Sequence, residues 1–196
     1  MTIYTQQSGK VRIRTAQPAT CSHPSLSELD VSNPDESDVD FILHAFDSAL
    51  PYLASIGSEA QWGTVPFSAK PERISQFTQY IQEAYDLQSN PTKGGPGWQD
   101  MYLYEVLTDA TWTRVAVAGL SVQFPDYVPL DLADDSTRKA TDYVYLKYLV
   151  TDRRSGGLAK GSASQLMTFI ETISRDMGKK ICYGDCWRGN GDNLLK

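Results

Sequence analysis

Long apolar runs and a surplus of positive charge are both missing from this chain. No stretch approaches the roughly eighteen apolar residues of a membrane span, and the polar start MTIYTQQSGK lacks the apolar run of a secretory signal. We therefore expect a cytoplasmic or nuclear protein that makes no membrane contact. The formal net charge of −6 disfavours nucleic acid as a partner, because nonspecific binding to phosphates relies on clustered Lys and Arg.

Cysteine and histidine are scarce. The chain has three cysteines, an odd number that argues against a disulfide framework, and two histidines, which leave a structural zinc site with few ligands. We therefore expect no metal. Cys182 and Cys186 are four residues apart on an expected strand, and we interpret them as two small buried side chains rather than a redox or metal pair.

The remaining composition is that of one soluble globular domain covering residues 1–196, since 41% of the residues are apolar and can form a substantial core. Hydrophobic periodicity separates helices from strands along the chain. It predicts strands at 11–16, 101–107, 113–124, 142–150 and 180–187, and helices at 35–56, 71–87 and 159–177. Short turns between the central strands favour antiparallel pairing, and the pattern is typical of an α+β fold.

A glycine-rich turn, DRRSGGLAKGSAS at 152–164, joins an expected strand to an expected helix. The first backbone N–H groups of a helix have no intrahelical partner, and together with the helix dipole they favour an anion. The residues alone leave two interpretations open, a phosphate cradle or a flexible turn that binds nothing. The order Lys160-Gly161-Ser162 does not fit a Walker A loop, and the turn follows too many strands for a dinucleotide fingerprint.

Arg154-x-x-Gly157-x-Ala159 resembles the Arg/Gln-x-x-Gly-x-Gly/Ala signature of the GNAT superfamily of acyl-CoA-dependent N-acetyltransferases. The order of expected elements resembles that family over nearly the whole chain. The resemblance implies an α/β/α sandwich, in which helices cover both faces of a mixed, mainly antiparallel sheet. A second register, with Gly156, Ala159 and Gly161 in the motif positions, also fits the turn.

The resemblance also implies acetyl-CoA as co-substrate and an amine as acceptor. Backbone amides of the turn would bind the coenzyme pyrophosphate, the end of the preceding strand would bind the pantetheine, and an asparagine near the last helix would contact the coenzyme. The residues that match these roles are Leu149, Val150, Arg154, Ser155, Gly156, Gly157, Leu158, Ala159, Lys160, Gly161, Ser162 and Asn190.

Catalysis in such a family is direct attack of a neutral amine on the thioester, for which a general base is useful. Our candidates are Glu105, Asp185 and Tyr145. We rank Glu105 first, because a carboxylate in an apolar strand is costly to bury without a partner or a task. An outward-facing Glu105 is the alternative. Gln61, Trp62 and Phe67 would line an acceptor groove, or Trp62 would simply anchor the core.

The chain ends at Lys196, where the family usually continues with a tyrosine-bearing helix segment and two strands. We therefore expect a C-terminally truncated GNAT-like domain, and the sheet surface left uncovered would favour a homodimer. Two other hypotheses stay open. The chain could be a coenzyme A-binding module without catalysis, or an interaction domain whose glycine turn binds nothing.

Overall fold

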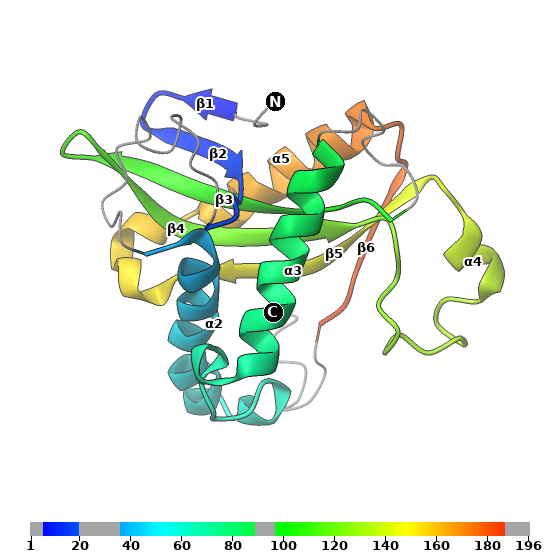
Figure 1. Cartoon of the computed structure of the whole chain (residues 1–196), viewed down its shortest axis with the longest axis horizontal. Coiled ribbons are helices and arrows are strands. Elements are labelled where there is room, and N and C mark those ends of the chain that lie inside the picture. Colours follow the sequence, from blue (N-terminus) through cyan, green and yellow to red (C-terminus); the bar gives the residue numbers. More distant parts are fainter. Residues whose placement is uncertain (1–5, 20–35, 89–96, 187–196) are drawn as a thin grey trace.

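The computed structural model describes residues 6–19, 36–88 and 97–186. Their core is one six-stranded sheet whose strands lie in chain order, β1 to β6 (Figure 1). Neighbouring strands are antiparallel from β1 to β5, whereas β5 and β6 are parallel. The strands are β1 (Gln6–Ser8), β2 (Val11–Thr15), β3 (Gln99–Thr108), β4 (Thr111–Ser121), β5 (Tyr143–Thr151) and β6 (Ile181–Gly184).

Helices cover both faces of the sheet, as expected for an α/β/α sandwich. Helices α2 (Asp38–Ser55) and α3 (Pro71–Gln88) lie on one face, and α5 (Ser162–Asp176) lies on the other (Figure 1). The short helix α4 (Asp135–Lys139) lies outside the layers, in the connection between β4 and β5. Three 3-10 segments complete the described helices, η1 (Glu59–Gln61), η2 (Phe67–Ala69) and η3 (Arg153–Ala159).

The alternation of side chains along the central strands divides the core in two. Met101 and Leu103 of β3 pack in the cluster under α2 and α3, whereas Tyr102 and Tyr104 pack in the cluster under α5. Period-two alternation places successive residues of a strand on opposite faces, so a strand buried on both faces contributes to both clusters. The sheet is therefore the shared wall of two half-cores.

The helices begin and end close to where the sequence predicts. Ser37 caps α2 through a capping box with Asp40, and the helix continues past Pro51 to Ser55. Hydrophobic periodicity does not predict β1 and α4, because both are too short to show a period. A final helix expected near the C-terminus lies outside the described residues. No helix in the described part of the chain is long and apolar enough to cross a bilayer.

Two β-bulges interrupt the central strands, one in β4 opposite β3 and one in β5 opposite β4. Tyr104 faces Ala116 and Glu105 faces Arg114, so Val115 is an extra residue in β4. Its carbonyl accepts the backbone N–H of Asp152 at 2.8 Å, which fixes the start of the glycine-rich turn. The second bulge lies in β5, where the register with β4 passes over Lys147. Such bulges redirect side chains and backbone groups locally.

Candidate functional site

The glycine-rich turn links β5 to α5 through η3. Gly156 has a φ of +53° and Gly161 a φ of +82°, conformations that glycine adopts without strain. Gly161 is the N-cap of α5 and has no side chain that could cap the helix. Its carbonyl accepts the backbone N–H of Gln165 at 3.1 Å. The first-turn amides of α5 are thus available to an anion, with the helix dipole behind them.

The structure places the predicted coenzyme-binding residues along the end of β5, the turn and the start of α5. Val150 is buried in the core, whereas Leu149 is 36% and Leu158 44% exposed. A Cβ added at Gly157 would meet no atom within 4 Å, so a side chain has room there. The Arg154 guanidinium is held by two carboxylates, because Asp152 and Glu36 both accept hydrogen bonds from it, Glu36 at 3.3 Å.

The turn also contains residues that stabilise it internally. Ser162 is buried, and its hydroxyl donates to the carbonyl of Ala159 at 2.7 Å. The buried carboxylate of Asp152 accepts the N–H of Arg154 and caps η3. Ser155, Lys160 and the glycines complete the loop, and Asn190 lies outside the described residues. The sequence pattern therefore identified the turn, while only the structure identifies which of its side chains are already engaged.

Beside the turn, β5 runs further than its parallel partner. Residues 143–146 of β5 pair with 181–184 of β6, and β5 then continues to Thr151 while pairing with β4 on its other side. Among the described residues, no strand pairs with 147–151 on the β6 side. The backbone N–H and C=O groups on this edge have no strand partner among the described residues, and the edge begins at the Lys147 bulge.

Two of the three predicted catalytic residues meet where β6 ends. Asp185 directly follows β6, and its Oδ1 accepts hydrogen bonds from the hydroxyls of both Tyr145 on β5 and Tyr127 in the β4–β5 connection, the latter at 3.1 Å. Its Oδ2 has no partner among the described residues. Phe124 packs against Tyr145 and Tyr183, and Tyr183 packs against Tyr143. Aromatic rings therefore surround this corner.

Burial and the Asp185 charge act together on these phenols. Burial, followed by the hydrogen bond to Asp185, raises the pKa of Tyr145 well above its usual range. Partial burial of its hydroxyl, followed by the Asp185 charge, also raises the pKa of Tyr127, although most of its side chain is exposed. Both hydroxyls therefore remain protonated at neutral pH, and they act as donors that hold the carboxylate rather than as ready acids.

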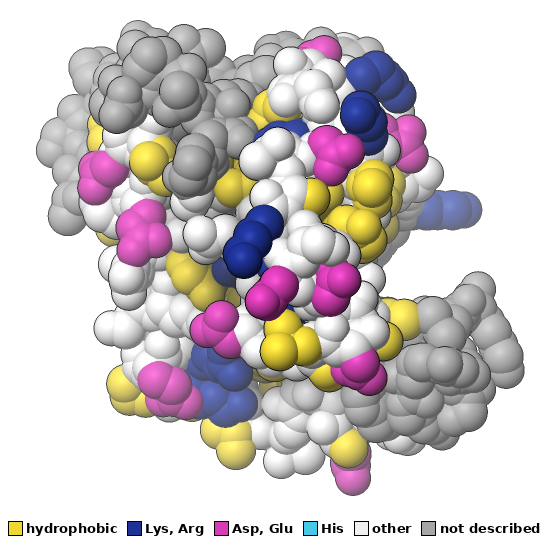
Figure 2. Space-filling model, turned by 90° about the vertical axis from the view of Figure 1, so that its right-hand side faces the viewer, with side chains coloured by type: hydrophobic (Ala, Val, Ile, Leu, Met, Phe, Trp, Pro, Cys, Tyr) yellow, Lys and Arg dark blue, Asp and Glu magenta, His cyan; other side chains and the backbone are white. Residues whose placement is uncertain are grey.

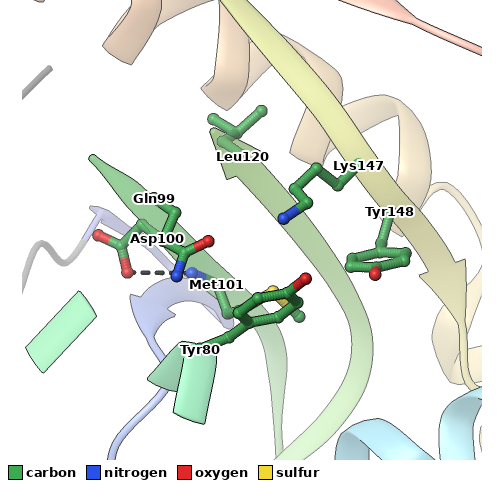
Figure 3. A pocket seen from close by; sticks show the side chains of 7 residues that line it. All are labelled: Tyr80, Gln99, Asp100, Met101, Leu120, Lys147 and Tyr148. Carbon is green, nitrogen blue, oxygen red and sulfur yellow. Dashed lines mark hydrogen bonds between the residues drawn. The ribbon is translucent and has the colours of Figure 1, made fainter. Parts of the chain in front are cut away.

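A small pocket lies next to this corner, on the α2 and α3 face (Figure 3). Its volume of about 10 Å³ leaves room for about one water molecule. The Lys147 ammonium lies 4.1 Å from the centre of the Tyr80 ring, a cation–π contact. The residues that line the pocket are Tyr80, Gln99, Asp100, Met101, Leu120, Lys147 and Tyr148.

Glycine at position 119 lets Tyr148 lie across β4 at this pocket. A Cβ on Gly119 would be 2.7 Å from Sδ of Met101 and 2.9 Å from Cδ2 of Tyr148. Burial, followed by the neighbouring Tyr80, raises the pKa of Tyr148 well above its usual range. The position of Tyr148 in the pocket lining therefore depends on this glycine.

Glu105, our first candidate base, lies elsewhere. It is fully buried, so the alternative of an outward-facing side chain is wrong. One oxygen accepts from Arg12 and the other from Arg14 at 3.1 Å. An acceptor amine has no path to this carboxylate in the structure, and the arginines are the partners that its burial requires. The alternating VRIRT pattern of β2 was the signal that placed both arginines on one face.

Two further expectations concern side chains outside this corner. Cys182 and Cys186 are exposed, so the prediction that they are buried is wrong. The reason is that β6 is the outermost described strand and ends before Cys186.

Trp62 and Phe67 anchor the core. Trp62 packs against Phe46, with ring centres 5.1 Å apart, and Phe67 is buried. The described residues contain no cluster of His, Cys, Asp and Glu suited to a metal.

Comparison with known proteins adds no identification. No protein-family model matches the chain, and no curated protein matches it.

Proposed function

We propose that this chain is an acetyl-CoA-dependent N-acetyltransferase of the GNAT type. The observation that carries the proposal is the unit formed by β5, the glycine-rich turn, α5 and β6. It combines a strand edge beyond Leu146 that no described strand occupies with uncapped amides at the start of α5. A coenzyme with a pyrophosphate and an extended pantetheine arm needs these two features, side by side.

The amides from Gly156 to Ser162 would bind the pyrophosphate, and the β5 edge at Leu149 and Val150 would pair with the pantetheine. Backbone groups dominate such a site, so the exposed side chains of the turn matter less than its shape. A backbone N–H near the Lys147 bulge would then polarise the thioester carbonyl as an oxyanion hole does. The thioester would lie level with Asp185, which follows the last residue of β6 that pairs with β5.

In this arrangement the acceptor nitrogen attacks the thioester carbon, the C–S bond breaks, and coenzyme A leaves as a thiolate. The proton of the amine goes to Oδ2 of Asp185, the oxygen that Tyr127 and Tyr145 leave open. A lysine-like amine has a pKa of roughly 10.4, so deprotonation at pH 7 costs about 4–5 kcal/mol and a nearby base is useful. Tyr145 is then a positioning residue that orients the base.

Calorimetry with acetyl-CoA tests the binding part. We expect saturable binding by the wild-type chain and affinity at least about tenfold lower in Gly157→Asp, because a carboxylate would lie against the pyrophosphate. The variant should fold normally, since the space at Gly157 is open. Thr78→Asp adds the same charge at an exposed position of α3. It is the matched control and should bind as the wild type does. Absence of binding at millimolar acetyl-CoA would contradict the proposal.

A thiol-release assay against a panel of amines tests the catalytic part. We expect Asp185→Asn to lower kcat by about 100-fold or more while acetyl-CoA affinity stays unchanged, because general-base catalysis contributes on that order. Asp86→Asn removes an exposed carboxylate of α3 and serves as the control. Full activity of Asp185→Asn would remove Asp185 from the mechanism. Binding of acetyl-CoA without turnover of any amine would favour a non-catalytic coenzyme A-binding module.

A further inference from the structure

The connection between β4 and β5 exposes large apolar side chains on one short stretch. Tyr127 is 66% exposed, Leu130 62% and Leu132 76%, more than any other large apolar side chain of the described residues. Figure 2 looks onto the side of the molecule that carries this connection. We call residues 126–135 the lip. Exposed apolar side chains that gather in one place often mark an interaction site.

The lip is folded, so this exposure does not come from a loose chain. The Arg138 guanidinium donates to the carbonyl of Ala133 at 2.9 Å and also to that of Val128. Tyr143 of β5 donates to the carbonyl of Arg138 at 3.2 Å, and Ala133 is buried. A surface that is ordered before binding loses little entropy when a partner docks.

The charge of the lip selects the partner. Asp126, Asp131 and Asp135 are exposed beside the apolar side chains, and the whole chain carries a net charge of −6. These charges repel nucleic acid and anionic membranes, and they also oppose pairing of the lip with a second copy of itself. A polypeptide that carries both Lys or Arg and apolar residues matches the surface in charge and in hydrophobicity.

We propose that the lip binds a basic, apolar-containing polypeptide segment. The lip is connected directly to the candidate base, because the Tyr127 hydroxyl donates to Asp185 at 3.1 Å. Resting on the proposed acetyltransferase function, the lip makes a polypeptide amine the acceptor class, with the docked segment presenting its amine to Asp185. The lip itself supplies binding and orientation and takes no part in the chemical step.

Fluorescence anisotropy with a labelled Lys/Leu/Ser peptide tests the inference, and the same peptide with Glu in place of Lys is its comparison. We expect saturable binding of the basic peptide alone, and at least tenfold weaker binding by Leu130→Ser/Leu132→Ser. Leu87→Ser removes a leucine on α3 that is exposed but lies outside the lip, and this variant should bind normally. Asp126→Asn/Asp131→Asn/Asp135→Asn should weaken binding and flatten its salt dependence, because salt shortens the Debye length from about 10 Å at 0.1 M to about 3 Å at 1 M.

The assay contains no acetyl-CoA, so the two proposals fail separately. A chain that binds acetyl-CoA but not the basic peptide overturns only the lip inference. A chain that binds the peptide but not acetyl-CoA overturns the acetyltransferase, and with it the acceptor role of the peptide, while peptide binding by the lip stands. Equal binding of the Glu peptide, unchanged affinity in the double leucine variant, or self-association that the lip variants abolish would each overturn the lip inference.

Discussion

Asp38 and Glu105 are buried carboxylates that arginines from two strands surround. Arg14 of β2 binds both, reaching Asp38 at 2.8 Å through Nη2, and Arg114 of β4 reaches Asp38 at 3.0 Å. Glu36 and Asp152 extend the network to Arg154 on the glycine-rich turn. Charges buried this deeply are tolerated only when they are paired, and the network ties the start of α2 to the sheet and to the turn.

Removal of one member should show how strongly the network depends on pairing. We expect Asp38→Asn to lower the free energy of unfolding by about 3–5 kcal/mol, because it leaves Arg14 with a missing buried countercharge. Urea unfolding at pH 7 measures the loss, and the exposed Asp86→Asn is the control. A loss below about 1 kcal/mol would mean that the network contributes little.

The same residue sets a pH dependence. Burial alone would raise the pKa of Asp38, but the charge and hydrogen bonds of Arg14, aided by Arg114, hold it below its ordinary value of 3.8. A carboxylate with a lowered pKa in the folded state contributes stability above that ordinary value. The contribution is lost as the pH falls below it toward the folded-state pKa. The wild-type chain should therefore lose more stability than Asp38→Asn between about pH 5 and pH 3.

The sequence revealed that Glu105 needed a partner or a task, but it did not reveal which. Its partners Arg12 and Arg14 lie 93 and 91 positions away. Hydrophobic periodicity describes local structure, so it cannot pair charges over such a separation. The Tyr145–Asp185 contact spans 40 positions, and the sequence proposed both residues without linking them.

At the scale of elements, the β3–β4 hairpin contains a conformation that its sequence does not favour. Asp109 and Ala110 have φ values of 49° and 67°, as in a type I′ turn, in which glycine is preferred at the second position. A left-handed conformation costs a non-glycine residue roughly 1–2 kcal/mol. The hairpin therefore forms because β3 and β4 pair along their length, in spite of its turn.

Relief of this strain should stabilise the protein. We expect Ala110→Gly to raise the free energy of unfolding by about 0.5–1 kcal/mol, since the added flexibility of glycine in the unfolded chain offsets part of the relief. Ala54→Gly, at an exposed position of α2, should instead lower it by about 1 kcal/mol. Midpoints of urea unfolding compare the two variants, and destabilisation by Ala110→Gly would contradict the turn assignment.

The other elements follow the sequence more closely. The period of α3 and the capping residues of α2 are local signals, and both helices lie where these signals predict. The glycine-rich turn also lies between a strand and a helix, as expected, but its detailed conformation depends on distant contacts. The backbone N–H of Asp152 donates to the Val115 carbonyl on β4, and that of Arg153 donates to the Ser48 hydroxyl on α2.

At the scale of the whole molecule, the sheet brings the features of the site together. The turn, the β5 edge that no described strand occupies and the Asp185 corner all lie along β5, because β6 returns parallel to it after α5 (Figure 1). The acidic lip joins the same corner from the β4–β5 connection. One side of the molecule therefore carries the candidate coenzyme site, the candidate base and the surface proposed for the acceptor.

The α+β class, the main helices and strands, and the position of the glycine-rich turn follow from the sequence, because they depend on periodicity and composition within short windows. The tertiary structure alone decided that Glu105 is locked between arginines, that Asp185 is held by two tyrosines, and that β5 outruns β6. Each of these depends on strand register and on bulges, which bring together residues far apart in the chain. A one-residue change in register reverses the face of every side chain, and the local sequence does not specify that choice.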